Sequence, residues 1–184
     1  MTNTSDRTKE IARLGVMAAL SVVLAALFHF PLFPSASYLE YDPADIPVLL
    51  TAFLYGPVAG VIITAVVSIV QGITVSVSGG VIGILMHFLA TGCFCIAASL
   101  PYHRNKSTKT LCTGLVLGTL VMAAVMVLCN LVFTPLYTGM SVAAVAGMVP
   151  TVILPFNLLK AGINALCTFL LFRPLKKLFF EESK

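Results

Sequence analysis

Long apolar stretches, separated by short polar segments or by proline and glycine, dominate the chain. A membrane-crossing helix needs about 20 predominantly apolar residues to span a hydrocarbon core of roughly 30 Å. The pattern predicts six helices, at about residues 11–30, 46–54, 58–75, 81–100, 111–133 and 150–172. The second is too short to cross upright, which predicts that the polar segment before it dips into the protein.

Composition supports the same fold class. The chain is 59% hydrophobic and only 10% charged, whereas a soluble domain carries about 25% charged residues. This small number of charges cannot cover a water-facing surface. We therefore expect an all-α integral membrane protein that forms a single membrane domain over residues 1–184. The first apolar run is too long for a signal-peptide core, so we interpret it as a retained helix.

The basic residues predict the orientation of this domain. They lie in three blocks beside the apolar runs: Arg7, Lys9 and Arg13; Arg104, Lys106 and Lys109; Arg173, Lys176, Lys177 and Lys184. Six crossings would place all three blocks on one side, and Lys and Arg accumulate on the cytoplasmic side of membrane proteins. Both termini are therefore expected in the cytoplasm. The net charge of +4 reflects this orientation rather than binding to nucleic acid.

One basic residue, Lys160, falls inside the sixth apolar stretch. A lysine near mid-membrane costs at least about 2.5–3.5 kcal/mol on insertion scales, so it needs a partner, a wet cavity or a ligand. Asn157, Lys160 and Asn164 share one helical face because they are spaced i, i+3 and i+7. Asn130 supplies a second intramembrane amide, on the fifth helix. Amides and an ammonium can bind the edge of a planar heterocycle that alternates carbonyl and N–H groups.

A structural role for the same residues is the alternative. Lys160 could extend toward the interface or pair with an acid, for which Asp42 and Asp45 are the candidates, and the asparagines could join helices. Phe156 lies beside the polar stripe and could face a ring. His87, in the fourth helix, fits packing or a minor ligand contact better than catalysis.

Signatures of catalysis, nucleotide binding and metal binding are missing from the sequence. It contains no G-x-x-x-x-G-K-[ST] and no H-E-x-x-H, its three histidines are far apart, and its five cysteines lie in or beside apolar segments. We therefore expect no enzyme activity, no ATP site, no metal and no cofactor. The first helix carries the small residues Ala12, Gly15 and Ala19, a face that allows another helix to approach closely, within this chain or from a partner.

Four segments resemble a known family. They are Tyr41–Pro47 (YDPADIP), Gly56–Gly60 (GPVAG), Ser78–Gly80 (SGG) and Pro155–Lys160 (PFNLLK). In order and spacing they resemble the riboflavin-specific S components (RibU type) of energy-coupling factor (ECF) transporters. The resemblance implies the six-helix S-component fold in a bacterial plasma membrane. It also implies capture of riboflavin or a related flavin from outside, with ATP hydrolysed by two ATPase subunits that join through a transmembrane coupling subunit (EcfT).

The resemblance also implies roles for individual residues. Asn130, Asn157 and Lys160 match positions that bind the polar edge of the flavin ring. The loop before the second helix, which contains Leu39, is expected to close over the site, and Asp45 to help hold it. The full set of expected substrate-binding residues is Asn130, Asn157, Lys160, Asn164, Asp45, Leu39, Phe156 and His87. Ala12, Gly15 and Ala19 become the expected docking face for the coupling subunit.

Two departures from the family pattern bear on the ligand. Gln71-Gly72 stands where many members carry Lys-Asn, and His87 stands where asparagine is common. Another vitamin is therefore an alternative; pantothenate, an anion, would suit Lys160, whereas thiamin, a cation, would not. A self-sufficient secondary transporter is the alternative from a different class, and it would need internal repeats or a membrane-embedded acid, neither of which the sequence shows.

Overall fold

The computed structural model describes residues 4–33, 36 and 39–180, and nearly all of them are helical. Two short strands, β1 (Phe30–Pro31) and β2 (Glu40–Tyr41), form an antiparallel pair in which Phe30 faces Tyr41. The helices are α1 (Thr4–Leu27), α2 (Asp45–Tyr55), α3 (Pro57–Thr74), the 3₁₀ turn η2 (Val77–Gly79), α4 (Gly80–Arg104), α5 (Thr108–Thr138), α6 (Val142–Met148), the π-helical turn η3 (Val149–Ile153) and α7 (Leu154–Phe180). The all-α class predicted from the sequence is thus confirmed, apart from the two short strands.

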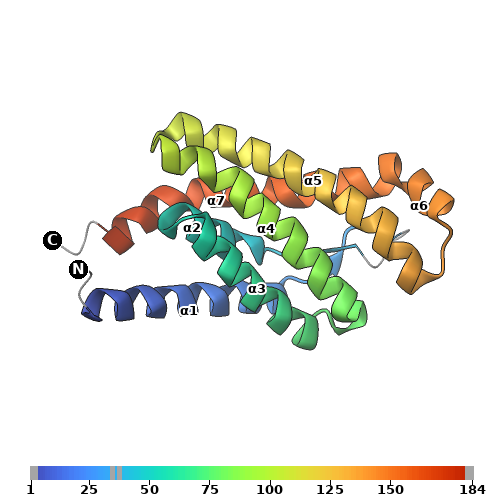
Figure 1. Cartoon of the computed structure of the whole chain (residues 1–184), viewed down its shortest axis with the longest axis horizontal. Coiled ribbons are helices and arrows are strands. Elements are labelled where there is room, and N and C mark those ends of the chain that lie inside the picture. The colour runs from blue at the N-terminus through green and yellow to red at the C-terminus, as the bar shows by residue number, and fades with distance from the viewer. Residues whose placement is uncertain (1–3, 34–35, 37–38, 181–184) are drawn as a thin grey trace.

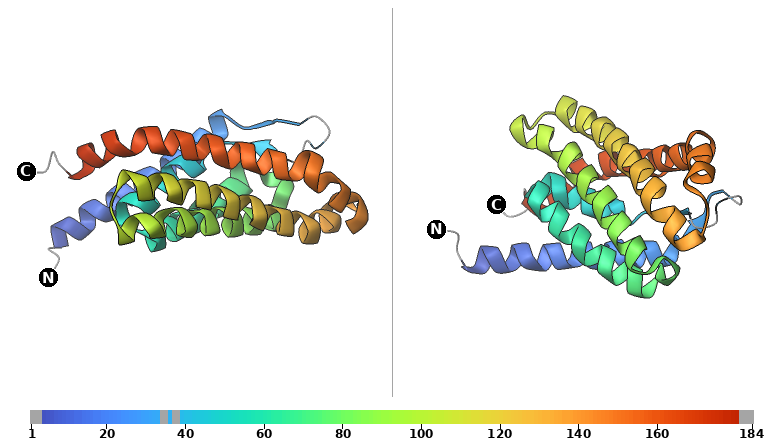
Figure 2. Two further views of the ribbon diagram at one scale, coloured as in Figure 1. Left: turned by 90° about the horizontal axis from the view of Figure 1, so that it is seen from above. Right: turned by 45° about the vertical axis from the view of Figure 1, so that its right-hand side comes forward.

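The long helices run lengthwise beside one another (Figure 1). The start of α1 and the end of α7 lie at the same end of the molecule, whereas α6 and the segment that follows α1 lie toward the other end (Figure 2). Among the described residues, five helical runs are long and apolar enough to cross a membrane: α1, α3, α4 with η2, α5, and α6 through α7.

Helix α2 explains how the polar segment before it enters the protein. Its 11 residues reach only about 16 Å at 1.5 Å per residue, roughly half of a hydrocarbon core. In the segment Glu40–Ala44 before it, Asp42 is buried, and Asp45, the first residue of α2, is completely buried. Asp45 through Phe53 are all buried, against α1, α3, α4 and α7.

The predicted ends of the last two helices were wrong. Pro135 does not stop α5; the helix continues to Thr138 and ends where Gly139 adopts the left-handed conformation, φ 72°, with its N–H donating to the Pro135 carbonyl. The predicted loop before residue 150 is mostly α6 and η3, which lead directly into α7. Proline is tolerated inside membrane helices because local adjustments satisfy the carbonyl that it leaves free.

Glycine allows the closest helix contact, between α4 and α5. A Cβ atom at Gly114 would lie 2.1 Å from the carbonyl oxygen of Ala98, and one at Gly118 would lie 2.6 Å from the Phe94 ring. Small residues let backbones approach in this way in lipid, where packing rather than the hydrophobic effect drives helix association. This contact fixes α4 against α5, the two helices that carry His87 and Asn130.

Candidate ligand-binding site

A cavity of about 350 Å³ lies among α3, α4, α5, α7 and the segment that joins α1 to α2. Its walls combine apolar surface with a few polar groups, the usual character of a small-molecule site. The residues that line it include His29, Leu39, Glu40, Asp42, Gln71, His87, Asn130, Phe156, Asn157 and Lys160. Its volume is in the range of pockets that hold drug-sized ligands.

Lys160 lies at the wall of this cavity and is only 8% exposed. Its Nζ donates to Asp42 Oδ2 at 2.7 Å and to the Glu40 carbonyl oxygen at 3.3 Å. Of the two acids named from the sequence, Asp42 is therefore the partner. Burial is the largest influence on Asp42 and would raise its pKa, but the charge and hydrogen bond of Lys160 together with nearby His87 lower the pKa overall, so the carboxyl stays ionised. An ammonium has three donors, so one N–H of Lys160 is not used by these two contacts.

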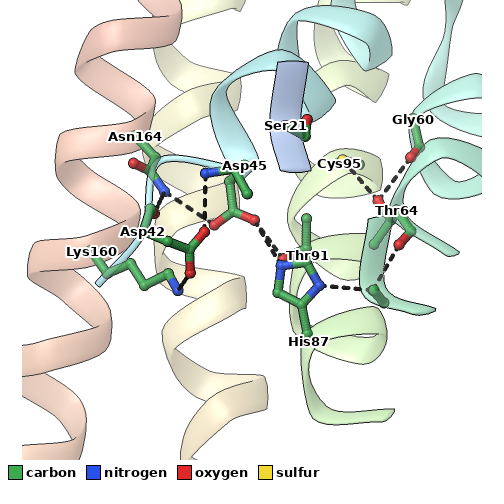
Figure 3. A network of polar contacts seen from close by, with 12 residues as sticks. Ser21, Asp42, Asp45, Gly60, Thr64, His87, Thr91, Cys95, Lys160 and Asn164 are labelled. Atoms are coloured by element: carbon green, nitrogen blue, oxygen red, sulfur yellow. Dashed lines mark hydrogen bonds and ion pairs between the residues drawn. The ribbon is translucent and has the colours of Figure 1, made fainter. Parts of the chain in front are cut away.

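A second buried network lies beside the first and contains Asp45 (Figure 3). Asn164 Nδ2 donates to Asp45 Oδ2 at 3.2 Å, and the Thr91 hydroxyl donates to Asp45 Oδ1 at 2.8 Å. His87 lies between α4 and α3, with Nε2 3.4 Å from Asp45 Oδ1 and Nδ1 2.7 Å from Ser68 Oγ. These contacts tie the start of α2 to α3, α4 and α7, so Asp45 holds the entering segment in place.

The two cavity asparagines are each fixed by their own helix. Asn157 Nδ2 donates to the Ile153 carbonyl in the π-helical turn, and Asn130 Nδ2 donates to the Met126 carbonyl. Asn130 Oδ1 in turn accepts from the Thr134 hydroxyl. Asn157 Oδ1 is buried without a hydrogen-bond partner. A buried acceptor left unpaired costs about 1–3 kcal/mol, and because Asn157 lines the cavity, this acceptor is placed where a ligand could pair with it.

The segment over the cavity is held by a contact that sequence reasoning missed. His29, two residues beyond the end of α1, has Nε2 2.6 Å from Glu40 Oε2, across the small β1–β2 pair. Both residues line the cavity, and His29 Nδ1 is buried without a partner. The sequence signal was weak, because nothing in a spacing of eleven residues pairs these side chains until the chain turns back on itself.

The expected site residues separate into three groups in the structure. Cavity-lining residues are Leu39, His87, Asn130, Phe156, Asn157 and Lys160. Asn164 and Asp45 do not line it; they lie in the supporting network, where Asn164 also accepts from the Tyr41 hydroxyl. Ala12, Gly15 and Ala19 lie on an exposed face of α1, away from the cavity.

Both departures from the family pattern, Gln71-Gly72 and His87, border the cavity. Gln71 is 4% exposed and its Oε1 has no hydrogen-bond partner. Gly72 is packed so closely that a Cβ there would lie 2.2 Å from the Ile84 side chain. A longer side chain at residue 72 would require Ile84 to move, so Gly72 and Ile84 together shape this end of the cavity.

Comparison with known proteins identifies the family of this chain. Residues 9–172 match the family described as "ECF transporter, substrate-specific component". The chain belongs to this family. It is 33% identical over 178 residues to the riboflavin transporter RibU of Staphylococcus aureus, with 92% of each chain covered, and 30% identical over 179 residues to the riboflavin transporter FmnP of Bacillus subtilis, covering 92% of this chain and 93% of the relative.

A solved structure supports the same placement for this S component. The S component of a bacterial ECF transporter superposes with a TM-score of 0.80 at 34% identity, over 95% of this chain and 99% of the other. The expected S-component fold is thereby confirmed, as is the expectation of a multi-pass membrane protein of bacteria. Membership in a family of substrate-binding transport subunits also agrees with the expectation that the chain is not an enzyme.

Proposed function

We propose that this S component binds riboflavin in the cavity beside Lys160 and delivers it for ATP-driven uptake powered by partner subunits. The observation that carries the proposal is the arrangement of polar atoms at one wall. Asn157 Oδ1 is an unpaired acceptor, and the amide of Asn130 and the ammonium of Lys160 each keep an N–H that the contacts described above do not use.

This arrangement complements the edge of an isoalloxazine ring. That edge presents a carbonyl, an imide N–H and a second carbonyl in order. Asn157 Oδ1 would accept from the imide N–H, while Lys160 and Asn130 would donate to the flanking carbonyls. Leu39 and Phe156, which also line the cavity, supply apolar surface for the ring. The curated relatives named above are riboflavin transporters, which supports the same ligand.

Pantothenate is less well matched by the site. Its carboxylate would need a cation, and the Lys160 ammonium already pairs with Asp42 at 2.7 Å. A self-sufficient transporter is disfavoured because the family supplies the substrate-specific component of a larger machine.

The proposal extends to orientation and assembly. We propose six crossings with α2 as the short one, both termini in the cytoplasm, and docking of the coupling subunit EcfT, with its two ATPase subunits, through α1. Gly15 supports this surface, because a Cβ built there meets nothing within 4 Å, and Ala12 and Ala19 on the same face are exposed. The face is thus open for close approach by a partner helix.

Purified protein in detergent provides the test of the ligand. Bound flavin would colour the preparation yellow, and added riboflavin should lose fluorescence on binding. Asn157→Leu removes the unpaired acceptor in a side chain of similar size, so riboflavin affinity should fall about 10- to 100-fold, the equivalent of one buried hydrogen bond. Asn105→Leu, at an exposed position, is the matched control and should bind normally. A colourless wild-type protein that does not quench micromolar riboflavin would rule out the assignment.

A further inference from the structure

We propose that Thr134 and Ala161 decide which hydrogen-bonding atom each cavity asparagine offers to the ligand. Thr134 makes Asn130 a donor, and Ala161 leaves Asn157 an acceptor. The inference rests on the proposed function, because it concerns how the same site recognises the edge of the flavin ring. Neither Thr134 nor Ala161 lines the described part of the cavity, and both side chains are completely buried. They are therefore positioning residues that act through the asparagines.

The two asparagines are anchored in the same way. Asn130 Nδ2 donates to the Met126 carbonyl at 2.8 Å, and Asn157 Nδ2 donates to the Ile153 carbonyl at 2.8 Å. In each case the acceptor is the main-chain carbonyl four residues earlier. A carbonyl oxygen cannot donate, so it must face the nitrogen of the amide and not the oxygen. Both amides are thus held in the same sense on their own helices, and the difference between them lies in their oxygens.

The residue four positions later determines what happens to each oxygen. Thr134 Oγ1 donates to Asn130 Oδ1 at 2.8 Å. The other neighbour of this hydroxyl, the Tyr137 hydroxyl, is 3.5 Å away, so the single proton of Thr134 goes to Asn130. Ala161 has no hydroxyl, and Asn157 Oδ1 has no hydrogen-bond partner among the described residues. Asn130 therefore presents an N–H to the cavity and Asn157 presents an oxygen, which matches a ring edge that alternates carbonyl and N–H groups.

The direction of the Thr134 hydroxyl is unusual in this chain. Eight serine and threonine side chains of the described helices are buried. Six of them donate to the main-chain carbonyl four residues earlier, the common arrangement in helices: Ser21, Thr51, Thr64, Ser68, Ser99 and Thr168. Thr134 and Thr91 instead donate to side chains, and the partner of Thr91 is Asp45, which holds the entering segment. The hydroxyl of Thr134 thus serves the cavity asparagine and not its own helix.

The first test measures the dissociation constant of riboflavin by fluorescence quenching of the full chain in detergent. Thr134→Val removes the hydroxyl in a side chain of the same shape and should weaken binding at least about fivefold, the equivalent of one hydrogen bond. Thr134→Ser keeps the hydroxyl and should bind within about twofold of the wild type. Thr119→Val is the control on the same helix, because the Thr119 hydroxyl donates to the main-chain carbonyl of Leu115; it should bind normally.

The reciprocal test places a hydroxyl beside the second asparagine. In Ala161→Ser the new hydroxyl can donate to Asn157 Oδ1 as Thr134 does to Asn130. The ligand-free protein then no longer holds an unpaired acceptor, so riboflavin should bind at least about fivefold more weakly, while the melting midpoint without ligand stays the same or rises. Ala165→Ser adds a hydroxyl one turn further along α7, where the residue four positions earlier is an alanine, and should bind normally.

The outcomes separate this inference from the proposed function. Riboflavin binding by Thr134→Val within about twofold of the wild type, or Thr134→Ser as weak as Thr134→Val, would overturn the role of Thr134. Normal affinity of Ala161→Ser, or an affinity that falls together with the melting midpoint, would overturn the role of Ala161. In all of these cases a wild-type chain that binds riboflavin leaves the proposed function intact. Failure of the wild-type chain to bind riboflavin would overturn both.

Discussion

The Asp42–Lys160 pair gives the sharpest quantitative prediction for the fold. Asp42 is 4% exposed and Lys160 is 8% exposed, and their charged atoms lie 2.7 Å apart. In Asp42→Asn the ammonium would keep only neutral acceptors, such as the Glu40 carbonyl at 3.3 Å. Removing one partner of a buried ion pair costs about 3–5 kcal/mol, because the other charge stays buried. We therefore expect Asp42→Asn to lower the free energy of unfolding by about that amount.

Thermal unfolding of the detergent-solubilised protein measures the effect. One kcal/mol corresponds to about 2–4 °C for a domain of this size, so the midpoint should fall by roughly 6–20 °C. Glu10→Gln removes a carboxylate from an exposed position and should leave the midpoint within about 2 °C. In the double variant Asp42→Asn/Lys160→Met no uncompensated charge remains, so much of the lost stability should return.

Two results would refute this reasoning. A midpoint for Asp42→Asn within 2 °C of the wild type would mean that water or another group solvates Lys160. A double variant no more stable than Asp42→Asn would mean that the cost comes from lost packing of the entering segment rather than from the unpaired charge.

Three further predictions concern pH, helix packing and assembly. Because the pKa of Asp42 is lowered in the folded protein, its contribution to stability should be complete above the ordinary carboxyl value of about 3.9 and disappear as the pH falls through the lower folded value; Asp42→Asn should abolish that part of the acid transition in a pH series of melting curves, and an unchanged series would contradict it. Gly114→Ala would put a Cβ 2.1 Å from an α4 carbonyl and should cost about 1–3 kcal/mol, whereas Gly92→Ala, with nothing within 4 Å, should melt at or slightly above the wild-type temperature; equal midpoints would refute the close contact. Gly15→Leu should leave riboflavin binding unchanged but reduce co-purification of the coupling subunit by at least about tenfold, and normal co-purification would exclude this face as the docking surface.

Most of the helices could be predicted from local sequence. Apolar length and charge depletion indicate membrane helices directly, and the basic blocks predict which ends of the helices face the cytoplasm. The predicted fifth helix ended at about residue 133, whereas α5 continues through Pro135 and ends where Gly139 adopts the left-handed conformation. The short second helix, of 11 residues, did predict that the polar segment before it enters the protein, where Asp42 is buried.

Only part of the candidate site could be predicted from the sequence. Lys160 stood out because a charge in an apolar helix needs compensation, and Asp42 was one of two possible partners. The sequence could not decide between Asp42 and Asp45 as the partner of Lys160. Asp42 and Lys160 are 118 residues apart, and helical periodicity does not predict contacts over such a separation. Asn164 shares a helical face with Lys160 but lies one turn further along α7, where it contacts Asp45 and does not line the cavity. His29 and Glu40 come together because β1 pairs with β2. These two-residue strands show no hydrophobic pattern in the sequence.

The half-length α2 has a consequence for how the chain is made. A segment this short does not integrate stably by itself, and the acid that precedes it finds its lysine only in α7, 118 residues later. At about 5–20 residues per second, ribosomes need roughly 6–24 s to supply that partner. During this interval Asp42 lacks the ammonium with which it pairs in the folded protein. The contact between Asp42 and Lys160 is therefore among the last that the growing chain can form, and chains released before Lys160 would lack the charge that compensates buried Asp42.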